Sequence, residues 1–310
     1  MSNQQPEAWP ALPLEGWRDT SETFHLWTQI VGKVRLTQTP WINHTWNSTL
    51  YVTSRGLTTS PIPHGTRTFD IEFDLIAHEL VVRTSEGDVF NMPLEPQTVA
   101  EFHEQLLDAL ARLHVPVKIH GRPNELENPI PFKRDRTHKS YDRDAVNRFW
   151  RVLVQADRLF KIFRSRFIGK CSPVHFFWGA ADLAVTRFSG RVAPPHPGGI
   201  PNLPDRVTRD AYSHEVSSCG FWAGGGPIAY PAFYAYAYPE PAGFAAAPVR
   251  PAQAFYSADV REFILPYDAV RTAADPDSTL LEFVQSTYDA AADSARWDRA
   301  ALEAAAQHPV

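Results

Sequence analysis

The chain has 310 residues, 44% hydrophobic and 21% charged, values that are typical of globular proteins rather than disordered or fibrous ones. Its net charge of -5 argues against a general nucleic-acid binder, which normally carries a surplus of Lys and Arg. The two cysteines cannot supply a disulfide framework, and no stretch reaches the roughly 18 apolar residues of a membrane helix. The N-terminus lacks a signal-peptide pattern, so we expect a cytoplasmic protein with no nucleic-acid or membrane partner.

The first predicted element is a helix. Trp27, Ile30, Val31 and Val34 recur at helical spacing behind good capping residues. Turn residues end this helix, and a strand is expected over 50–59.

The strongest strand signal is a strict alternation of apolar and acidic residues over 69–75, which predicts one buried face and one wet face. Two further strands, 80–84 and 89–94, complete an antiparallel meander. Thr98 and Glu101 then form a capping box, which predicts a second helix.

The same order of elements then recurs. After a polar, Pro-containing linker over 120–143, a helix is expected over 144–163 and a strand region over 174–188. A last strand over 263–267 precedes a helix that opens at Thr279.

The repeated order predicts an α+β fold built from two helix, antiparallel-sheet, helix units related by a pseudo-twofold axis. The units span 1–119 and 144–297, with a tail over 298–310. One continuous sheet shared by both units and two separate domains are both consistent with this pattern.

The second unit is longer than the first, and the extra residues fall within 190–251, where Gly and Pro are frequent. This predicts a loop rather than scaffold, and long ordered loops in compact domains usually serve function. We expect it to cover one end or face of the sheet and to form a pocket with these residues: His175, Asp182, Arg187, His196, His214 and Glu215.

Five strings carry a resemblance over nearly the whole chain, from about Trp9 to Trp297. They are Gly56–Pro61, Phe167–Gly179, Asp182–Arg191, Ala211–Glu215 and Phe233–Pro239. Together they resemble an uncharacterised bacterial family known as a domain of unknown function, DUF5996. The resemblance implies no activity, cofactor or catalytic residue.

Three histidines could bind a divalent metal such as zinc or iron: His175, His196 and His214. No closely spaced pair of histidines fixes two ligands on one element. Structural or acid/base histidines are the alternative.

Without a metal, His214, Glu215 and Asp182 are the candidates for acid/base catalysis. Arg187 is the candidate for binding an anionic group. On a regular strand, however, Asp182 and Arg187 point to opposite faces unless a bulge or turn intervenes.

Three more residues complete the predicted substrate-binding set: Arg55, Trp178 and Tyr236. Tyr236 belongs to an aromatic stripe that alternates with alanines. The function predicted is a cytosolic enzyme acting on a small polar or anionic molecule. The alternative is a non-enzymatic module that binds a small ligand or a protein through the Pro-rich loop and the aromatic strand. Reaction type, substrate and oligomeric state do not follow from the sequence.

Overall fold

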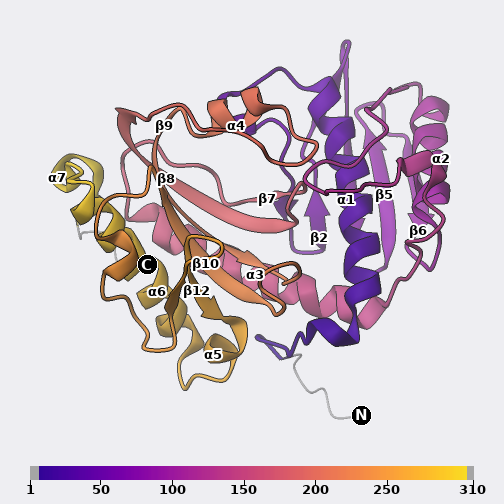
Figure 1. Cartoon of the computed structure of the whole chain (residues 1–310). Helices are drawn as coiled ribbons and strands as arrows, with labels where there is room; N and C mark the ends of the chain where they lie inside the picture. Colours follow the sequence, from indigo (N-terminus) through magenta and orange to yellow (C-terminus); the bar gives the residue numbers. More distant parts are fainter. Residues whose placement is uncertain (1–6, 306–310) are drawn as a thin grey trace.

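The computed structural model describes residues 7–305 and has an α+β fold (Figure 1). Seven α-helices and two antiparallel six-stranded sheets make up these residues. No helix within 7–305 combines the length and the apolar character that crossing a membrane requires.

The first unit runs from the N-terminal helix to the end of the second helix. Its elements are η1 (Leu14–Gly16), α1 (Arg18–Gln38), η2 (Asn43–Thr45), β1 (Tyr51–Val52), β2 (Gly56–Thr58), β3 (Ile62–His64), β4 (Arg67–Asp74), β5 (Glu79–Thr84), β6 (Val89–Pro93) and α2 (Val99–Arg112).

A connecting stretch with one short helix, η3 (Phe132–Arg134), leads to the second unit. The elements of that unit are α3 (Arg143–Ser165), β7 (His175–Phe177), β8 (Asp182–Val192), α4 (Asp205–Ala211), β9 (His214–Trp222), β10 (Ala232–Tyr238), η4 (Phe244–Ala246), β11 (Phe255–Ser257), β12 (Glu262–Pro266), α5 (Tyr267–Arg271), α6 (Pro276–Ser294) and α7 (Arg299–Leu302).

Both sheets are antiparallel and flanked by helices, and in the second sheet β12 lies between β10 and β11. The first has the strand order β1-β2-β4-β5-β6 with β3 beside β4, and the second has the order β11-β12-β10-β9-β8-β7. The two sheets meet edge to edge through one pair of residues, Leu50 and Phe176, which exchange backbone hydrogen bonds of 2.9 and 2.8 Å. The pseudo-twofold relation between the units stays a prediction.

One hydrophobic core serves both units. Phe149 of α3 lies near its centre: its ring centroid is 5.3 Å from that of Trp17 in the first unit and 6.5 Å from that of Phe221 in the second sheet. Aromatic pairs at such distances add to the free energy gained by burying apolar area. The helix α3 therefore packs against residues of both units.

The most regular sequence patterns are confirmed. Phe69, Ile71 and Phe73 of β4 are fully buried, whereas Asp70 on the opposite face pairs with Arg83. The capping box of α2 and the helix α3 also form as expected.

One expected strand is a hairpin instead, because the 50–59 region folds into β1 and β2. The expected strand region over 174–188 consists of β7, a turn and the start of β8. The last long helix begins before Thr279, because Asp275 caps it by accepting from the Ser278 N–H at 3.0 Å.

Two expected loop regions contribute more to the fold than the sequence indicated. The range 190–251 contains α4 together with β9 and β10, which are central strands of the second sheet, so only part of it is loop. The 120–143 linker packs into the protein, with Phe132 fully buried. The 298–310 tail forms α7, and residues 306–310 lie outside the described residues.

Candidate functional site

The second sheet presents two chemically different faces. Along β8, Leu183, Val185 and Arg187 are buried on the side of α3, whereas Asp182 and Thr186 point to the other face. The two faces follow from the period of two in a β-strand. Asp182 and Arg187 therefore do not share the one pocket that was expected, and regular alternation along β8 places them on opposite faces.

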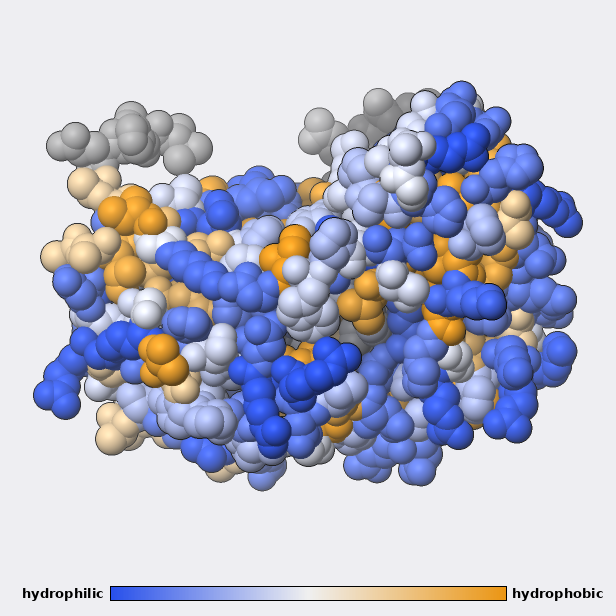
Figure 2. All heavy atoms as spheres, turned by 90° about the horizontal axis from the view of Figure 1, so that it is seen from above, coloured by the Kyte–Doolittle hydropathy of each residue, from blue (hydrophilic) through white to orange (hydrophobic). Residues whose placement is uncertain are grey.

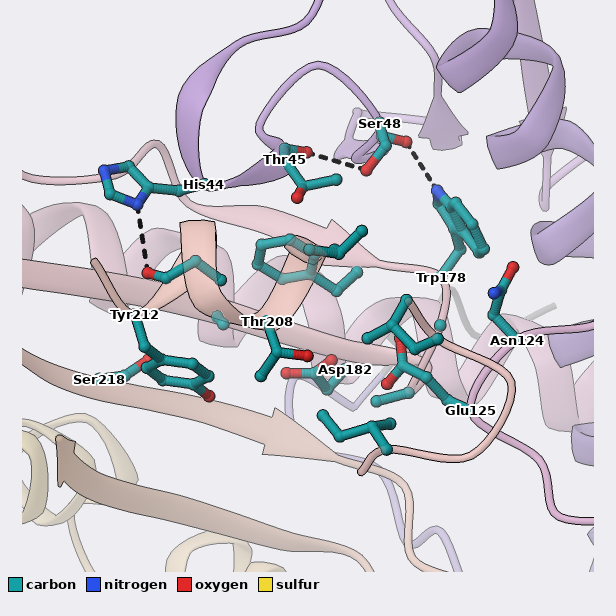
Figure 3. Close-up of a pocket in the computed structure, with 18 of the residues that line it drawn as sticks. His44, Thr45, Ser48, Asn124, Glu125, Trp178, Asp182, Thr208, Tyr212 and Ser218 are labelled. Atoms are coloured by element: carbon teal, nitrogen blue, oxygen red, sulfur yellow. Dashed lines mark hydrogen bonds between the residues drawn. The ribbon is translucent and has the colours of Figure 1, made fainter. Parts of the chain in front are cut away.

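The face that carries Asp182 forms the floor of a cavity of about 840 Å³ (Figure 3). Segment 200–212, which includes α4, lies over this floor, and 41–48, 120–125 and the C-terminal half of α1 close the sides. A cavity of this size is in the range of small-molecule sites.

The walls of the cavity are mostly apolar and aromatic. Large contributors are Trp46, Phe177, Trp178, Phe188, Trp222 and Ile264. In the view from the side of α4, hydrophilic side chains cover most of the outer surface, and apolar ones appear in small groups (Figure 2). The apolar area is thus concentrated inside the molecule.

Hydrogen bonds of His44 connect segment 200–212, the cover of the cavity, to the 41–48 side wall. Its backbone N–H donates to Asp210 Oδ2 at 2.8 Å, and its Nδ1 lies 3.0 and 3.2 Å from the carbonyl oxygens of Asp210 and Ala211. Two acceptors at Nδ1 place the proton there, so Nε2 accepts from Lys170 Nζ at 2.6 Å. Burial and the Lys170 charge lower the pKa of His44, which keeps the imidazole neutral.

Hydroxyl pairs satisfy other polar groups in the cavity. Tyr212 and Tyr236 place their Oη atoms 3.0 Å apart, and Thr186 and Ser218 place their Oγ atoms 2.8 Å apart. Burial raises the pKa of Tyr212 to about 12, so this phenol stays protonated.

Three carboxyl groups converge on the cavity: Asp182 from β8, Glu262 from β12 and Glu125 from the 120–125 segment. Burial raises the pKa of Asp182 to about 6 and those of Glu125 and Glu262 to about 7. The negative charge of Asp182 adds to the shift of both glutamates. All three groups can therefore gain or lose a proton near neutral pH.

Asp182 has one direct side-chain partner, because Tyr234 of β10 donates its phenolic hydrogen to Asp182 Oδ2. The phenol reaches across Gly220 of β9, which is its cross-strand neighbour. A Cβ at Gly220 would lie 2.4 Å from Tyr234 Oη and 2.5 Å from the Leu183 carbonyl oxygen. The contact between the phenol and the carboxylate therefore requires glycine at this position.

Glu125 is positioned by its backbone and by a second glycine. Its φ of 61° is unusual for this residue type, and its N–H donates to the Pro201 carbonyl at 2.9 Å. A Cβ at Gly179 would lie only 1.8 Å from Glu125 Oε1. The carboxyl group thus packs directly on the turn between β7 and β8, close to Asp182 (Figure 3).

Two residues of the cavity lining carry buried hydroxyl groups without a partner. Thr45 Oγ1 and Thr208 Oγ1 are shielded from solvent and have no hydrogen-bond partner among residues 7–305. Buried hydroxyls are normally paired, and an unpaired one costs free energy. Thr208 lies in α4, so one of these groups belongs to the segment above the cavity floor.

The structure brings three of the residues predicted from sequence into the cavity: Asp182, Trp178 and Tyr236. Trp178 is held by a hydrogen bond of 2.7 Å from its Nε1 to the Ser48 carbonyl oxygen.

Two of the predicted residues lie outside the cavity lining at the far end of β9. His214 Nδ1 lies 3.1 Å from Ser213 Oγ, and Glu215 pairs with Arg191 at 2.6 Å.

The two predicted arginines are also outside the lining. Arg187 is buried on the other face of the sheet, with its guanidinium 3.5 Å from the ring centroid of Phe163. Arg55 pairs with Asp74 on the first sheet at 2.5 Å.

The three predicted metal ligands do not come together. His175 is fully buried, and neither ring nitrogen has a hydrogen-bond partner within 7–305; burial lowers its pKa to about 3. His196 stacks on Tyr212 with ring centroids 4.8 Å apart, whereas His214 lies beside Ser213. No group of three or more His, Cys, Asp or Glu side chains in the described chain could hold a metal ion.

Several cavity residues were missed by sequence reasoning: Lys33, Glu125, Thr208, Tyr212 and Glu262. The alternation of Glu262 with Phe263 could have placed the glutamate opposite the core, on the face of Asp182. The other residues lie on a helix or in irregular segments, where no periodic pattern identifies them.

Comparison with known proteins gives a family but no relative of established function. No curated protein and no solved structure matches the chain significantly. The model of one family covers residues 9–304, nearly the whole chain, in agreement with the resemblance of the five strings. The chain belongs to DUF5996, a family of unknown function.

Proposed function

We propose that the cavity binds a mainly apolar small molecule, and that Asp182 and Tyr234 hold a hydroxyl or amine group of that ligand. The observation that carries this proposal is the convergence of three carboxyl groups inside an otherwise apolar, covered cavity. Burying a carboxyl group is costly unless a partner compensates for it.

The charges in the cavity favour a neutral or cationic ligand over an anionic one. Three carboxyl groups stand against two cations of the lining, the buried ammonium group of Lys33 and the exposed guanidinium of Arg206, which lies 5.8 Å from the Trp41 ring centroid. Arg187 and Arg55 lie elsewhere. A ligand that donates a hydrogen bond to Asp182 would stabilise its ionised form, since hydrogen bonding to the charged form lowers the pKa of a carboxyl group. A bound anion would have the opposite effect.

The same carboxyl groups support a role in catalysis. With a pKa of about 6 or 7, each can act as a proton donor or acceptor near neutral pH. We therefore propose an enzyme that transfers protons on its ligand. Its proposed compartment is the cytosol, which the two free thiols of Cys171 and Cys219 support.

Calorimetric titration at pH 7.5 with three probes of one shape tests the binding proposal: 2-naphthylmethanol, 2-naphthylmethylamine and 2-naphthoate. We expect the alcohol and the amine to bind at least about tenfold more tightly than the carboxylate, because like charges repel in a cavity of low polarity.

Two variants localise the binding. Asp182→Asn should reduce the preference for the amine over the carboxylate, because one of the three carboxyl groups is removed. Asp70→Asn, on the half-buried polar face of the first sheet, is the matched control and should leave the preference unchanged. If no probe binds, or if Asp182→Asn keeps the full amine preference of the parent protein, the proposed site is wrong.

A further inference from the structure

The amine of Lys33 lies in the cavity, but the proposed binding by Asp182 and Tyr234 does not use it. Lys33 of α1 lines the cavity and is only 3% exposed. No carboxylate oxygen lies within 4.0 Å of its Nζ among residues 7–305. A buried lysine without a close counter-ion is uncommon, because burial disfavours the charged form.

The surroundings of Lys33 hold its amine in a fixed position. Its Nζ donates to Asn124 Oδ1 and lies 5.3 Å from the centroid of the Trp178 ring. Gly32, the residue before Lys33, packs against the same indole. The amine is therefore oriented by one amide oxygen and one aromatic ring.

Asn124, which accepts the hydrogen bond from Lys33, is itself held by Gln29 of α1. The Asn124 N–H donates to Gln29 Oε1 at 2.8 Å, and Gln29 Nε2 donates to the Asn124 carbonyl oxygen at 3.0 Å. Asn124 Nδ2 donates to the Asn202 carbonyl in the cover. These contacts leave Asn124 Oδ1 directed at Lys33, as hydrogen-bonded supporting residues do in preorganised sites.

Burial lowers the pKa of Lys33 to about 8, even though the charge of Glu125 acts in the opposite direction. With this pKa, roughly a tenth of the amine is neutral, and so nucleophilic, at pH 7, and roughly a quarter at pH 7.5. Lysines that form imines with carbonyl compounds are activated in this way, by desolvation in an apolar pocket.

We infer that Lys33 condenses with an aldehyde or ketone group of the bound ligand. This inference rests on the proposed function, because it adds a carbonyl group to the mainly apolar ligand of the same cavity.

The step balances with groups present in the cavity. The Lys33 Nζ lone pair forms a bond to the carbonyl carbon, the carbonyl oxygen gains a proton, and the nitrogen loses one, which gives a carbinolamine. Glu125, which follows Asn124 and lines the same cavity, supplies the proton with which the hydroxyl group leaves as water. The product is a protonated imine, and no oxidant or reductant is consumed.

Reductive trapping of the unmodified protein tests this inference. The protein is incubated with 2-naphthaldehyde and sodium cyanoborohydride at pH 7.5, and the naphthylmethylated lysines are located by peptide mass mapping. The chain has only six lysines, and the others serve as internal references: Lys118, Lys133, Lys139, Lys161 and Lys170. We expect Lys33 to be modified at least about tenfold faster than exposed Lys118.

Competition and two variants connect the modification to the cavity. An excess of 2-naphthylmethanol should slow modification of Lys33 without affecting Lys118. Lys33→Arg, which keeps a cation and cannot form the imine, should lose the fast reaction, whereas Lys118→Arg should retain it.

Modification of Lys33 no faster than Lys118 would overturn the inference. If 2-naphthylmethanol still binds in that case, only the carbonyl chemistry fails. If the alcohol does not bind either, the proposed function fails as well.

Discussion

The two sheets differ in what covers the face that is not packed on the core. On the first sheet this face carries Asp70 and Glu72, which pair with Arg83 at 3.2 and 3.0 Å. On the second sheet it carries Asp182 and Tyr234, enclosed beneath segment 200–212.

The comparison shows that alternation in sequence specifies a polar face but not its surroundings. Exposed ion pairs are screened by water and contribute at most about 1 kcal/mol. Under a cover, the same residue types lose water, and their pKa values move towards neutrality. The carboxyl groups of the second sheet thus lie enclosed in a cavity, whereas those of the first are partly buried and paired with Arg83, and burial raises the pKa of Asp70 as well.

The largest test of this difference is the pH dependence of stability in Asp182→Asn. The pKa of Asp182 rises from 3.8 to about 6 on folding, so ionising it in the folded protein costs roughly 3 kcal/mol. This cost is absent below pH 4 and complete above about pH 7. Urea unfolding should therefore show the variant gaining up to roughly 3 kcal/mol over the parent protein between pH 4 and pH 8.

The matched change on the exposed face is Asp70→Asn. It should alter the free energy of unfolding by less than about 1 kcal/mol at every pH, because the contact with Arg83 offsets part of the partial burial that raises the pKa of Asp70. Equal pH profiles for the two variants would remove the distinction between the covered and exposed faces.

The next largest expected effect is the loss of stability on substituting Gly220, where β9 approaches Tyr234 and the Leu183 backbone closely. Gly220→Ala adds a methyl group 2.5 Å from the backbone oxygen of Leu183, and backbone cannot yield as a flexible side chain can. We expect a loss of about 2 kcal/mol in urea unfolding. Gly121→Ala, where no atom lies within 4 Å of the added carbon, is the control and should change stability by less than about 0.5 kcal/mol.

The smallest expected effect is on the attachment of the cover. Asp210→Ala removes the carboxylate that accepts from the His44 N–H, a loss of about 1 kcal/mol. Hydrogen exchange of amides in 200–212 should become roughly five- to tenfold faster, since local opening then costs less. Arg209→Ala, which loses two exposed contacts, 3.4 Å to Asp205 and 3.3 Å to the His196 carbonyl oxygen, should leave the exchange rates near those of the parent. Comparable acceleration in both variants would show that the His44 contact does not hold the cover.

Much of the fold could be predicted from sequence, because strict alternation in β4 and the capping box of α2 are local signals. The hairpin over 50–59 was not expected, since a short apolar run leaves the position of a turn open.

The site was predictable only where it lies on a strand. Asp182 and Tyr236 were identified from β8 and β10, whereas Glu125 and Thr208 come from segments without periodicity. The tertiary fold brings these residues together, and one sequence does not reveal such distant contacts. His214 and Glu215 were favoured because they are polar neighbours on a strand, but chemical type alone does not determine which residues enclose a cavity.

The 120–125 segment has a consequence for any attempt to divide the protein. It crosses from the first unit to the second and delivers Glu125 to a cavity whose floor belongs to the second sheet. A fragment that starts at Arg143 would retain Asp182 and Glu262 but lack both Glu125 and Lys33. A chimera that joins the first unit of one family member to the second unit of another would therefore combine the Lys33 and Glu125 side of one cavity with the floor of the other. We expect its ligand preference to change even though the floor is unaltered.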